Sequence, residues 1–169
     1  MEQYVKTHIG ESIKELRLPR YHEIPDVGLY LEQVVKYLSD YLTPLGVSIT
    51  GSMVSNYVKK GLVSNPVKKQ YNRDQIAYLL FVSTIKSVVS MDDILLMVGI
   101  QKRTYTAQRA YDYFCSELEN ILQFVFGLKE EVDVVGVDET AEKIMLRNTI
   151  ITVAHKVYLN ALFQALREQ

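Results

Sequence analysis

The chain has no tryptophan, and its 169 residues include only one cysteine, four prolines and three histidines. The lone Cys115 has no partner within the chain, so an internal disulfide is excluded and a reducing cytoplasm is the expected compartment. No apolar run approaches the roughly 20 residues that a membrane-spanning helix needs. The polar start, Met1-Glu2-Gln3-Tyr4, is not followed by the apolar stretch of a signal peptide.

Motifs that carry catalytic or metal chemistry are also missing. His8, His22 and His155 are scattered and match no metal-ligand spacing. The chain contains no Cys-x-x-Cys, His-Glu-x-x-His, Walker loop or glycine-rich dinucleotide fingerprint. Cys115 follows Phe114 on an apolar helix pattern, where cysteine is far more often a core residue than a nucleophile. We therefore expect no enzyme activity, no cofactor and no metal site.

The composition is that of a globular protein, with 48% hydrophobic and 23% charged residues and a formal net charge of −1. The charge is distributed unevenly. Residues 50–75 sum to +5 − 1 = +4, so the remaining residues sum to −5. An acidic body with one basic patch is the distribution expected of a nucleic-acid-binding protein. The charges in this patch are Asp74 against Lys59, Lys60, Lys68, Lys69 and Arg73.

A short two-faced helix is predicted at the start of this patch, over residues 50–60. Thr50 can accept a hydrogen bond as its N-cap, and Gly61 can end it in the left-handed conformation. Placing residues 100° apart puts Met53, Val54, Tyr57 and Val58 on one arc. The other arc can address base edges and phosphates, although an ordinary solvated face would look the same. It contains Ser52, Ser55, Asn56, Lys59 and Lys60.

The following residues, 62–71, are too short and too rich in turn-forming residues for a helix. Two extended segments around Asn65-Pro66 would make a small β wing that carries Lys68 and Lys69. Asn72 with Gln75 then predicts a capping box for a helix that ends near residue 88 or 89. Ser90 predicts the cap of a further helix over residues 91–98, with two acids near its positive end.

The segment resembles the DNA-binding domain of MerR-type transcription regulators at three junctions in the right order. These are Val54-Ser55-Asn56-Tyr57-Val58-Lys59-Lys60-Gly61-Leu62, Lys69-Gln70-Tyr71-Asn72-Arg73-Asp74-Gln75-Ile76 and Val89-Ser90-Met91-Asp92-Asp93-Ile94. The resemblance implies a winged helix-turn-helix that binds double-stranded DNA. It differs from that family in having Ser55 where arginine is usual, a shorter wing and about fifty preceding residues.

Over most of its length the chain also resembles an uncharacterised bacterial family known only as a domain of unknown function. The stretch from Leu18 to Tyr30 and the run Asn56-Tyr57-Val58-Lys59-Lys60-Gly61-Leu62 are similar to its hallmarks. This resemblance implies a regulator and no particular ligand or target.

The rest of the chain is predicted to be helical. Helices are expected over residues 2–16, 27–42 with Asp26 as cap, 104–126 and 138–166, with a link at 127–137. The last helix is apolar on several sides, which a single partner helix cannot cover, so we expect a homodimer rather than a monomeric bundle. Arg17 and Arg20 could touch DNA, but pairing with Glu15 or Glu23 is favoured.

These observations predict a mainly α protein, with a MerR-like winged helix-turn-helix, a short β wing and a C-terminal pair of long helices. The expected parts are an N-terminal helix and arm at 1–25, a DNA-binding domain at 26–100 and a dimerisation region at 101–169 that could hold a small-molecule effector. The expected function is transcription regulation in the cytoplasm, with no membrane association. The alternative is a protein-interaction or small-molecule-sensing module without DNA binding, which Ser55 and the short wing favour. The DNA-contacting residues would be Ser52, Ser55, Asn56, Tyr57, Lys59, Lys60, Lys68, Lys69, Tyr71 and Arg73. In this set Tyr57 is ambiguous, since the angular plot points it to the core and the resemblance allows its hydroxyl to reach a phosphate.

Overall fold

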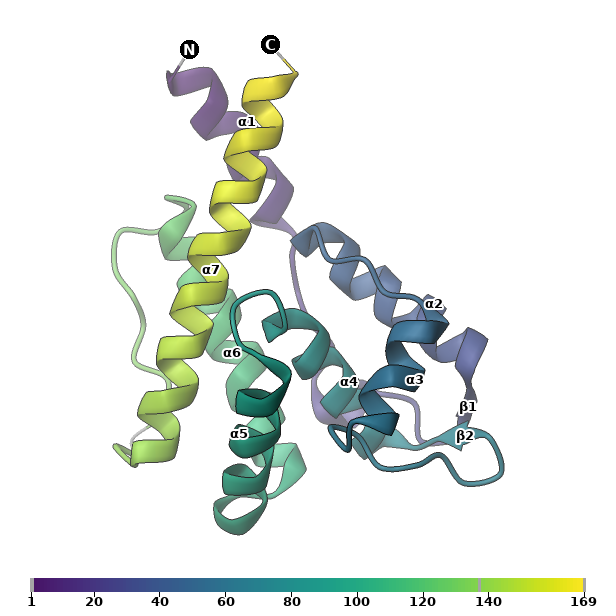
Figure 1. The fold of residues 1–169 in the computed structure, drawn as a ribbon. Coiled ribbons are helices and arrows are strands. Elements are labelled where there is room, and N and C mark those ends of the chain that lie inside the picture. The colour runs from purple at the N-terminus through teal and green to yellow at the C-terminus, as the bar shows by residue number, and fades with distance from the viewer. Residues whose placement is uncertain (1, 137, 169) are drawn as a thin grey trace.

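A computed structural model describes residues 2–136 and 138–168 and shows a mainly α protein (Figure 1). The described residues form seven α-helices and one two-stranded antiparallel sheet. The helices are α1 (Glu2–Lys14), α2 (Leu31–Leu42), α3 (Gly51–Lys59), α4 (Arg73–Ile85), α5 (Met91–Thr104), α6 (Ala107–Val125) and α7 (Ala141–Arg167). The strands are β1 (Leu29–Tyr30) and β2 (Gln70–Tyr71), and short 3-10 turns lie at Tyr21–Glu23 and Thr43–Leu45.

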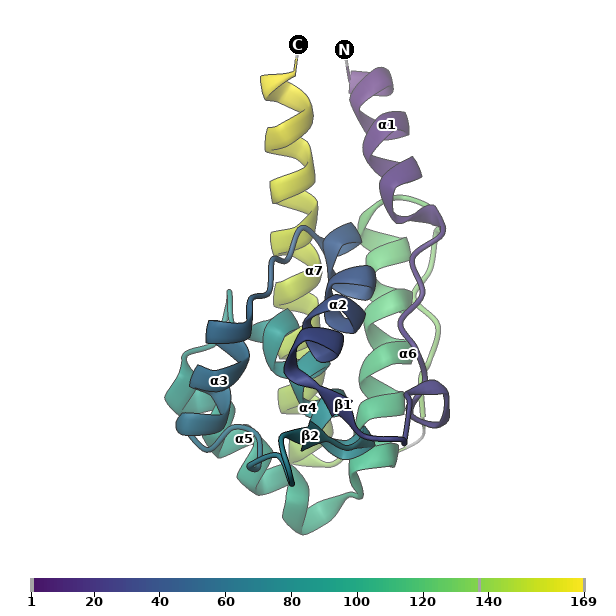
Figure 2. The ribbon, with the colours of Figure 1, turned by 90° about the vertical axis from the view of Figure 1, so that its right-hand side faces the viewer.

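The two long helices α6 and α7 run in the same direction, because the link between them returns along α6. Three contacts pair the two segments in the same order along the chain, from the residues just before the helices to their later turns. They join Tyr105 to Thr140, Glu117 to Arg147, and the ring of Phe126 to that of Tyr158. Asn120 holds the returning link through hydrogen bonds with the backbone of Asp133. The C-terminal end of α7 extends past helices α2 to α6 and lies beside α1 (Figures 1 and 2).

The core is continuous from α1 to α7, with α4 near its centre. Nine of the thirteen residues of α4 are buried, including Ile76, Leu79, Leu80 and Ile85. This helix contacts α2 on one side and α6 and α7 on the other. The small α2–α3 unit and the long C-terminal helices therefore share one core.

The sheet differs from the predicted wing. Its strand β2 pairs with β1, which precedes α2, with Leu29 opposite Tyr71 and Tyr30 opposite Gln70. The predicted helix start at residue 27 is therefore wrong: the helix begins at Leu31, and Asp26 is not its cap. Within 62–71 the chain reverses at Lys68 and Lys69 and not at Asn65-Pro66.

The helix α4 ends at Ile85 instead of near residue 88 or 89, and α7 begins at Ala141 instead of residue 138. A larger difference occurs at α5. That helix continues to Thr104 instead of ending at residue 98, so it crosses the expected domain limit at residue 100. The next helix accordingly begins at Ala107, with Thr106 as its cap, and not at Thr104. The predicted end of the link at Val137 lies outside the described residues. Among residues 2–136 and 138–168, no helix combines the length and hydropathy needed to cross a membrane.

Candidate nucleic-acid interface

The capping residues that predicted helix α3 form its two ends in the structure. The Thr50 hydroxyl accepts a hydrogen bond from the Met53 amide at 3.3 Å, and so caps the first turn. At the other end the Leu62 and Gly61 amides donate to the carbonyls of Tyr57 and Val58, both at 3.0 Å. Gly61 has a φ of +79°, the left-handed conformation that this C-terminal motif requires. Both predicted ends of the helix are therefore confirmed.

The two predicted faces of α3 are separated in the structure. Val54 and Tyr57 are buried on the inner face, and Met53 and Val58 are partly buried. The outer face is exposed, so its hydroxyl, amide and ammonium groups can contact a partner. It carries Ser52, Ser55, Asn56, Lys59 and Lys60.

A tight two-residue turn follows α3. Val67 and Gln70 exchange two backbone hydrogen bonds, at 3.1 and 2.9 Å, and Lys68 and Lys69 lie between them. Both lysines have positive φ, at 50° and 63°. Two central residues with positive φ are the mark of a type I′ turn, in which Asn-Gly is normally preferred. Two exposed lysines are thus held in a conformation that costs each of them energy.

The side chain of Gln75 holds the loop that leads into this turn. Its side-chain oxygen accepts from the Asn72 amide at 2.7 Å, which completes the predicted capping box of α4. Its side-chain nitrogen donates to the carbonyls of Ser64 at 3.0 Å and Asn65 at 2.8 Å. Gln75 is only 3% exposed, so one buried amide joins the start of α4 to the loop. The sequence predicted the cap but carried no signal for the two loop contacts.

Four lysines of the patch have no ion-pair partner among the described residues. Lys59 and Lys60 end α3, and Lys68 and Lys69 form the turn. All four side chains are exposed, and no carboxylate of the described chain lies within ion-pair distance of them. Their charges are therefore available to a polyanion from solution, at little desolvation cost.

Three other predicted residues lie elsewhere. Tyr57 is 1% exposed and Tyr71 is 5% exposed, so both belong to the core. Burial raises the pKa of Tyr57 to about 12, which keeps its phenol neutral. Arg73 donates to the Ile24 carbonyl at 2.8 Å and lies over the ring of Tyr21. The structure thus does not bring these three side chains to the outer face of α3 or to the turn at Lys68 and Lys69.

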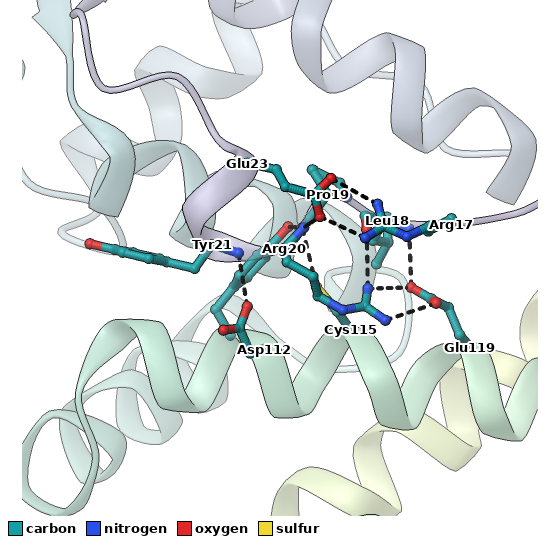
Figure 3. A network of polar contacts seen from close by, with 10 residues as sticks. Arg17, Leu18, Pro19, Arg20, Tyr21, Glu23, Asp112, Cys115 and Glu119 are labelled. Carbon is teal, nitrogen blue, oxygen red and sulfur yellow. Dashed lines mark hydrogen bonds and ion pairs between the residues drawn. The ribbon is translucent and has the colours of Figure 1, made fainter.

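The arm before α2 is bound to α6 by the network in Figure 3. Arg20 forms two hydrogen bonds with Glu119, at 2.6 and 3.0 Å, and Glu119 also accepts from the Leu18 amide. The side chain of Tyr111 donates to the Pro19 carbonyl at 2.6 Å. Glu119 was not identified from the sequence, because an acid 99 positions away leaves no local signal.

Arg17 pairs with Glu23 at 2.7 and 3.0 Å, which confirms the favoured prediction for this residue. The same carboxylate accepts from the Arg20 amide. These bonds lower the pKa of Glu23 to about 2, mainly through Arg17. For Arg20 the predicted partners Glu15 and Glu23 are wrong, because its side chain pairs with Glu119. Neither arginine of the arm therefore offers free charge, in contrast to the four lysines.

The connection between α2 and α3 covers residues 43–50 and includes a 3-10 turn. It is longer than the three or four residues of the most compact helix-turn-helix. No group of three or more potential metal ligands occurs in the described part of the chain. The lysine surface, defined here as the outer face of α3 with the Lys68–Lys69 turn, is thus the feature to which an external partner could be assigned.

Comparison with known proteins identifies one family. Its model, described as a domain of unknown function (DUF1836), matches residues 19–114, from the arm into α6. No curated protein matches the chain, and no solved structure does. The resemblance to MerR-type regulators stays a prediction. Because the match spans more than half of its residues, the chain belongs to the DUF1836 family, in agreement with the resemblance at Leu18–Tyr30.

Proposed function

We propose that this protein is a DNA-binding transcription regulator that contacts double-stranded DNA through the lysine surface. The observation that carries the proposal is a set of four exposed lysines, which have no ion-pair partner in the described part of the chain, beside a helix face of serine and asparagine. Lysines would neutralise phosphates, and Ser52, Ser55 and Asn56 would meet base edges. Phosphate contacts supply most of the affinity when a protein binds DNA in this way. We therefore expect most of the binding free energy to come from the DNA phosphate backbone, and little of it to depend on the base sequence.

The strained turn supports the same assignment. A type I′ turn would be more stable with asparagine and glycine at its centre, yet this chain has Lys68 and Lys69 there. Backbone strain of this kind concentrates at functional sites. Charge at the tip is thus retained at a cost in stability.

The test is binding to random duplex DNA over a series of salt concentrations. The affinity should fall steeply with salt, and Lys59→Ala and Lys68→Ala should each reduce the slope by about one. Lys14→Ala is the matched control, because Lys14 is an exposed lysine on α1. Undetectable binding at low salt, or slopes equal to that of the control, would reject the proposal in favour of a helical module without DNA binding.

We further propose that the regulator acts as a homodimer joined through the projecting end of α7. Leu159, Phe163 and Leu166 are 44%, 48% and 45% exposed, and their spacing places them on one helix face. Tyr4 of α1, the helix that packs beside this end, is also exposed. A second copy would bury this face, and a dimer matches the two half-sites of helix-turn-helix operators.

Sedimentation equilibrium tests the dimer independently of DNA. Phe163→Glu should shift the protein towards monomer, since a charge cannot be buried unpaired in an apolar interface. Leu96→Glu is the control, because Leu96 is 61% exposed on α5, away from the α7 face. A monomeric native protein, or a Phe163→Glu variant that stays dimeric, would contradict this interface.

A further inference from the structure

A cavity of about 430 Å³ lies between α4, α5, α6 and the start of α7. Sites for small organic molecules are typically clefts of roughly 300–1,000 Å³. The walls are mainly apolar and aromatic. They include Tyr78 and Phe81 of α4, Met97 of α5, Tyr111 and Tyr113 of α6, and Met145 of α7.

The aromatic walls favour a flat hydrophobic occupant. Phe81 meets Phe114 edge to face, with ring centroids 5.1 Å apart, and both side chains line the cavity. Methionine adapts its shape to irregular ligands, and the cavity has two, Met97 of α5 and Met145 of α7. Rings stacked or tilted against such walls gain more than their area alone provides.

The charged residues at the cavity differ in whether they are compensated. Arg109 pairs with Asp138 at 2.6 Å, and Asp112 accepts a hydrogen bond from the Tyr21 amide. Glu142 accepts from Thr104 at 3.4 Å. Lys143 has no carboxylate partner among the described residues.

The Lys143 ammonium instead lies 5.3 Å from the ring centre of Tyr113, which lines the same cavity. Lys143 is partly buried, and a cation in that position that lacks a carboxylate partner gains from an anionic acceptor.

We propose that this cavity binds an aromatic or similarly flat hydrophobic molecule that carries one anionic group, held by Lys143. The apolar body occupies the space between α4, α5 and α6, and the anion lies at the Lys143 edge. The site does not depend on DNA binding and would serve equally in a regulator or in a sensing module.

Two fluorescent probes of matched shape test the site in the full-length protein. Anilinonaphthalenesulfonate is an aromatic anion, and N-phenylnaphthylamine is its uncharged counterpart. Both should bind, and Lys143→Met should weaken the anion by about tenfold while leaving the neutral probe unchanged. Equal loss of both probes, or of neither, would overturn the role of Lys143.

Two further variants locate the binding. Ala110→Phe, which fills the cavity from α6, should abolish binding of both probes. Val27→Glu changes an 80% exposed apolar side chain outside the cavity and outside the proposed dimer interface, and should leave both affinities unchanged. Retained binding in Ala110→Phe, with far-ultraviolet circular dichroism showing a folded protein, would place the probes elsewhere and reject the site. If Ala110→Phe does not fold, Met145→Trp narrows the same space from α7 and decides by the same criterion.

Discussion

The arm at residues 17–23 and the turn at Lys68 and Lys69 both carry two positive charges, but the charges have opposite roles. Each arginine of the arm meets a carboxylate through two hydrogen bonds. Neither lysine of the turn meets one in the described structure. Paired charge holds the arm to the fold, whereas unpaired charge costs little to keep in water and stays available to an outside partner. The comparison separates the basic residues that stabilise the fold from those that would bind DNA.

The largest effect that would test this comparison is expected at Arg20. In the variant Arg20→Ala the Glu119 carboxylate, only 15% exposed, loses its partner, and the free energy of unfolding should fall by about 3 kcal/mol. Denaturant unfolding measures this. Arg17→Ala should have a much smaller effect, because the Arg17 side chain is 55% exposed and water screens its ion pair.

Cys115 provides a second readout of the same change. Its thiol is buried and donates to the Pro19 carbonyl of the arm at 3.6 Å. Burial raises the pKa of the thiol to about 12, so modification by a thiol reagent should be slow in the native protein. Arg20→Ala should accelerate it. Equal stability and equal thiol reactivity in the Arg17→Ala and Arg20→Ala variants would show that the arm is not held by the Arg20–Glu119 pair.

The next effect concerns how the turn is held without paired charge. Gln75→Leu removes the amide that binds two loop carbonyls and the α4 cap, and should lower the unfolding free energy by about 2 kcal/mol. Asn72→Ala removes only the cap and should cost about 1 kcal/mol. Hydrogen exchange at the Val67 and Gln70 amides distinguishes the two. It should accelerate only in Gln75→Leu, and unchanged exchange there would contradict the assigned role.

Relief of the strained turn should have a smaller effect, in the stabilising direction. Lys68→Asn combined with Lys69→Gly should raise the unfolding free energy by about 1 kcal/mol, because these residues tolerate positive φ. The same double variant should lose DNA affinity. Lys59→Gly is the matched control: it removes one lysine from a right-handed helix and should destabilise by about 1 kcal/mol. A turn that loses stability would show that the lysines are not strained.

The smallest effect is a pH response of the arm. Because Arg17 lowers the pKa of Glu23 to about 2, the contribution of this pair is complete above the ordinary value near 4.5. It should be lost as the pH falls through about 2. Carbon-detected nuclear magnetic resonance of the Glu23 carboxyl should report this pKa, and Arg17→Ala should return it towards the ordinary range. An ordinary pKa in the native protein would remove the pair from the comparison.

Prediction from sequence succeeded where the determining contacts are a few residues apart. Thr50 and Gly61 mark the two ends of α3, and Asn72 with Gln75 caps the start of α4. These signals are readable because capping groups and their partners lie within one helical turn. The strand pairing was missed because β1 and β2 are separated by about forty residues. Tertiary packing decides which distant strand pairs with β2. The sequence offered only nearby residues as partners, and so it predicted a hairpin within residues 62–71.

The predicted site residues divide in the same way. The polar arc of α3 reached the surface because helical periodicity alone separates it from Val54 and Tyr57. Arg73 could not be placed from its charge, because its acceptor is the Ile24 carbonyl, and every residue offers such a group. The Lys143 edge of the cavity gave no sequence signal either, since its walls come from four helices.

The sequence by itself determined the helical class, both ends of α3, the start of α4 and the concentration of positive charge between residues 50 and 75, since these features depend on neighbours along the chain. Only the tertiary structure decided which of those charges are free, because pairing depends on carboxylates and carbonyls that arrive from distant segments. Arg20 and Glu119 are 99 positions apart, and no rule of local spacing connects them.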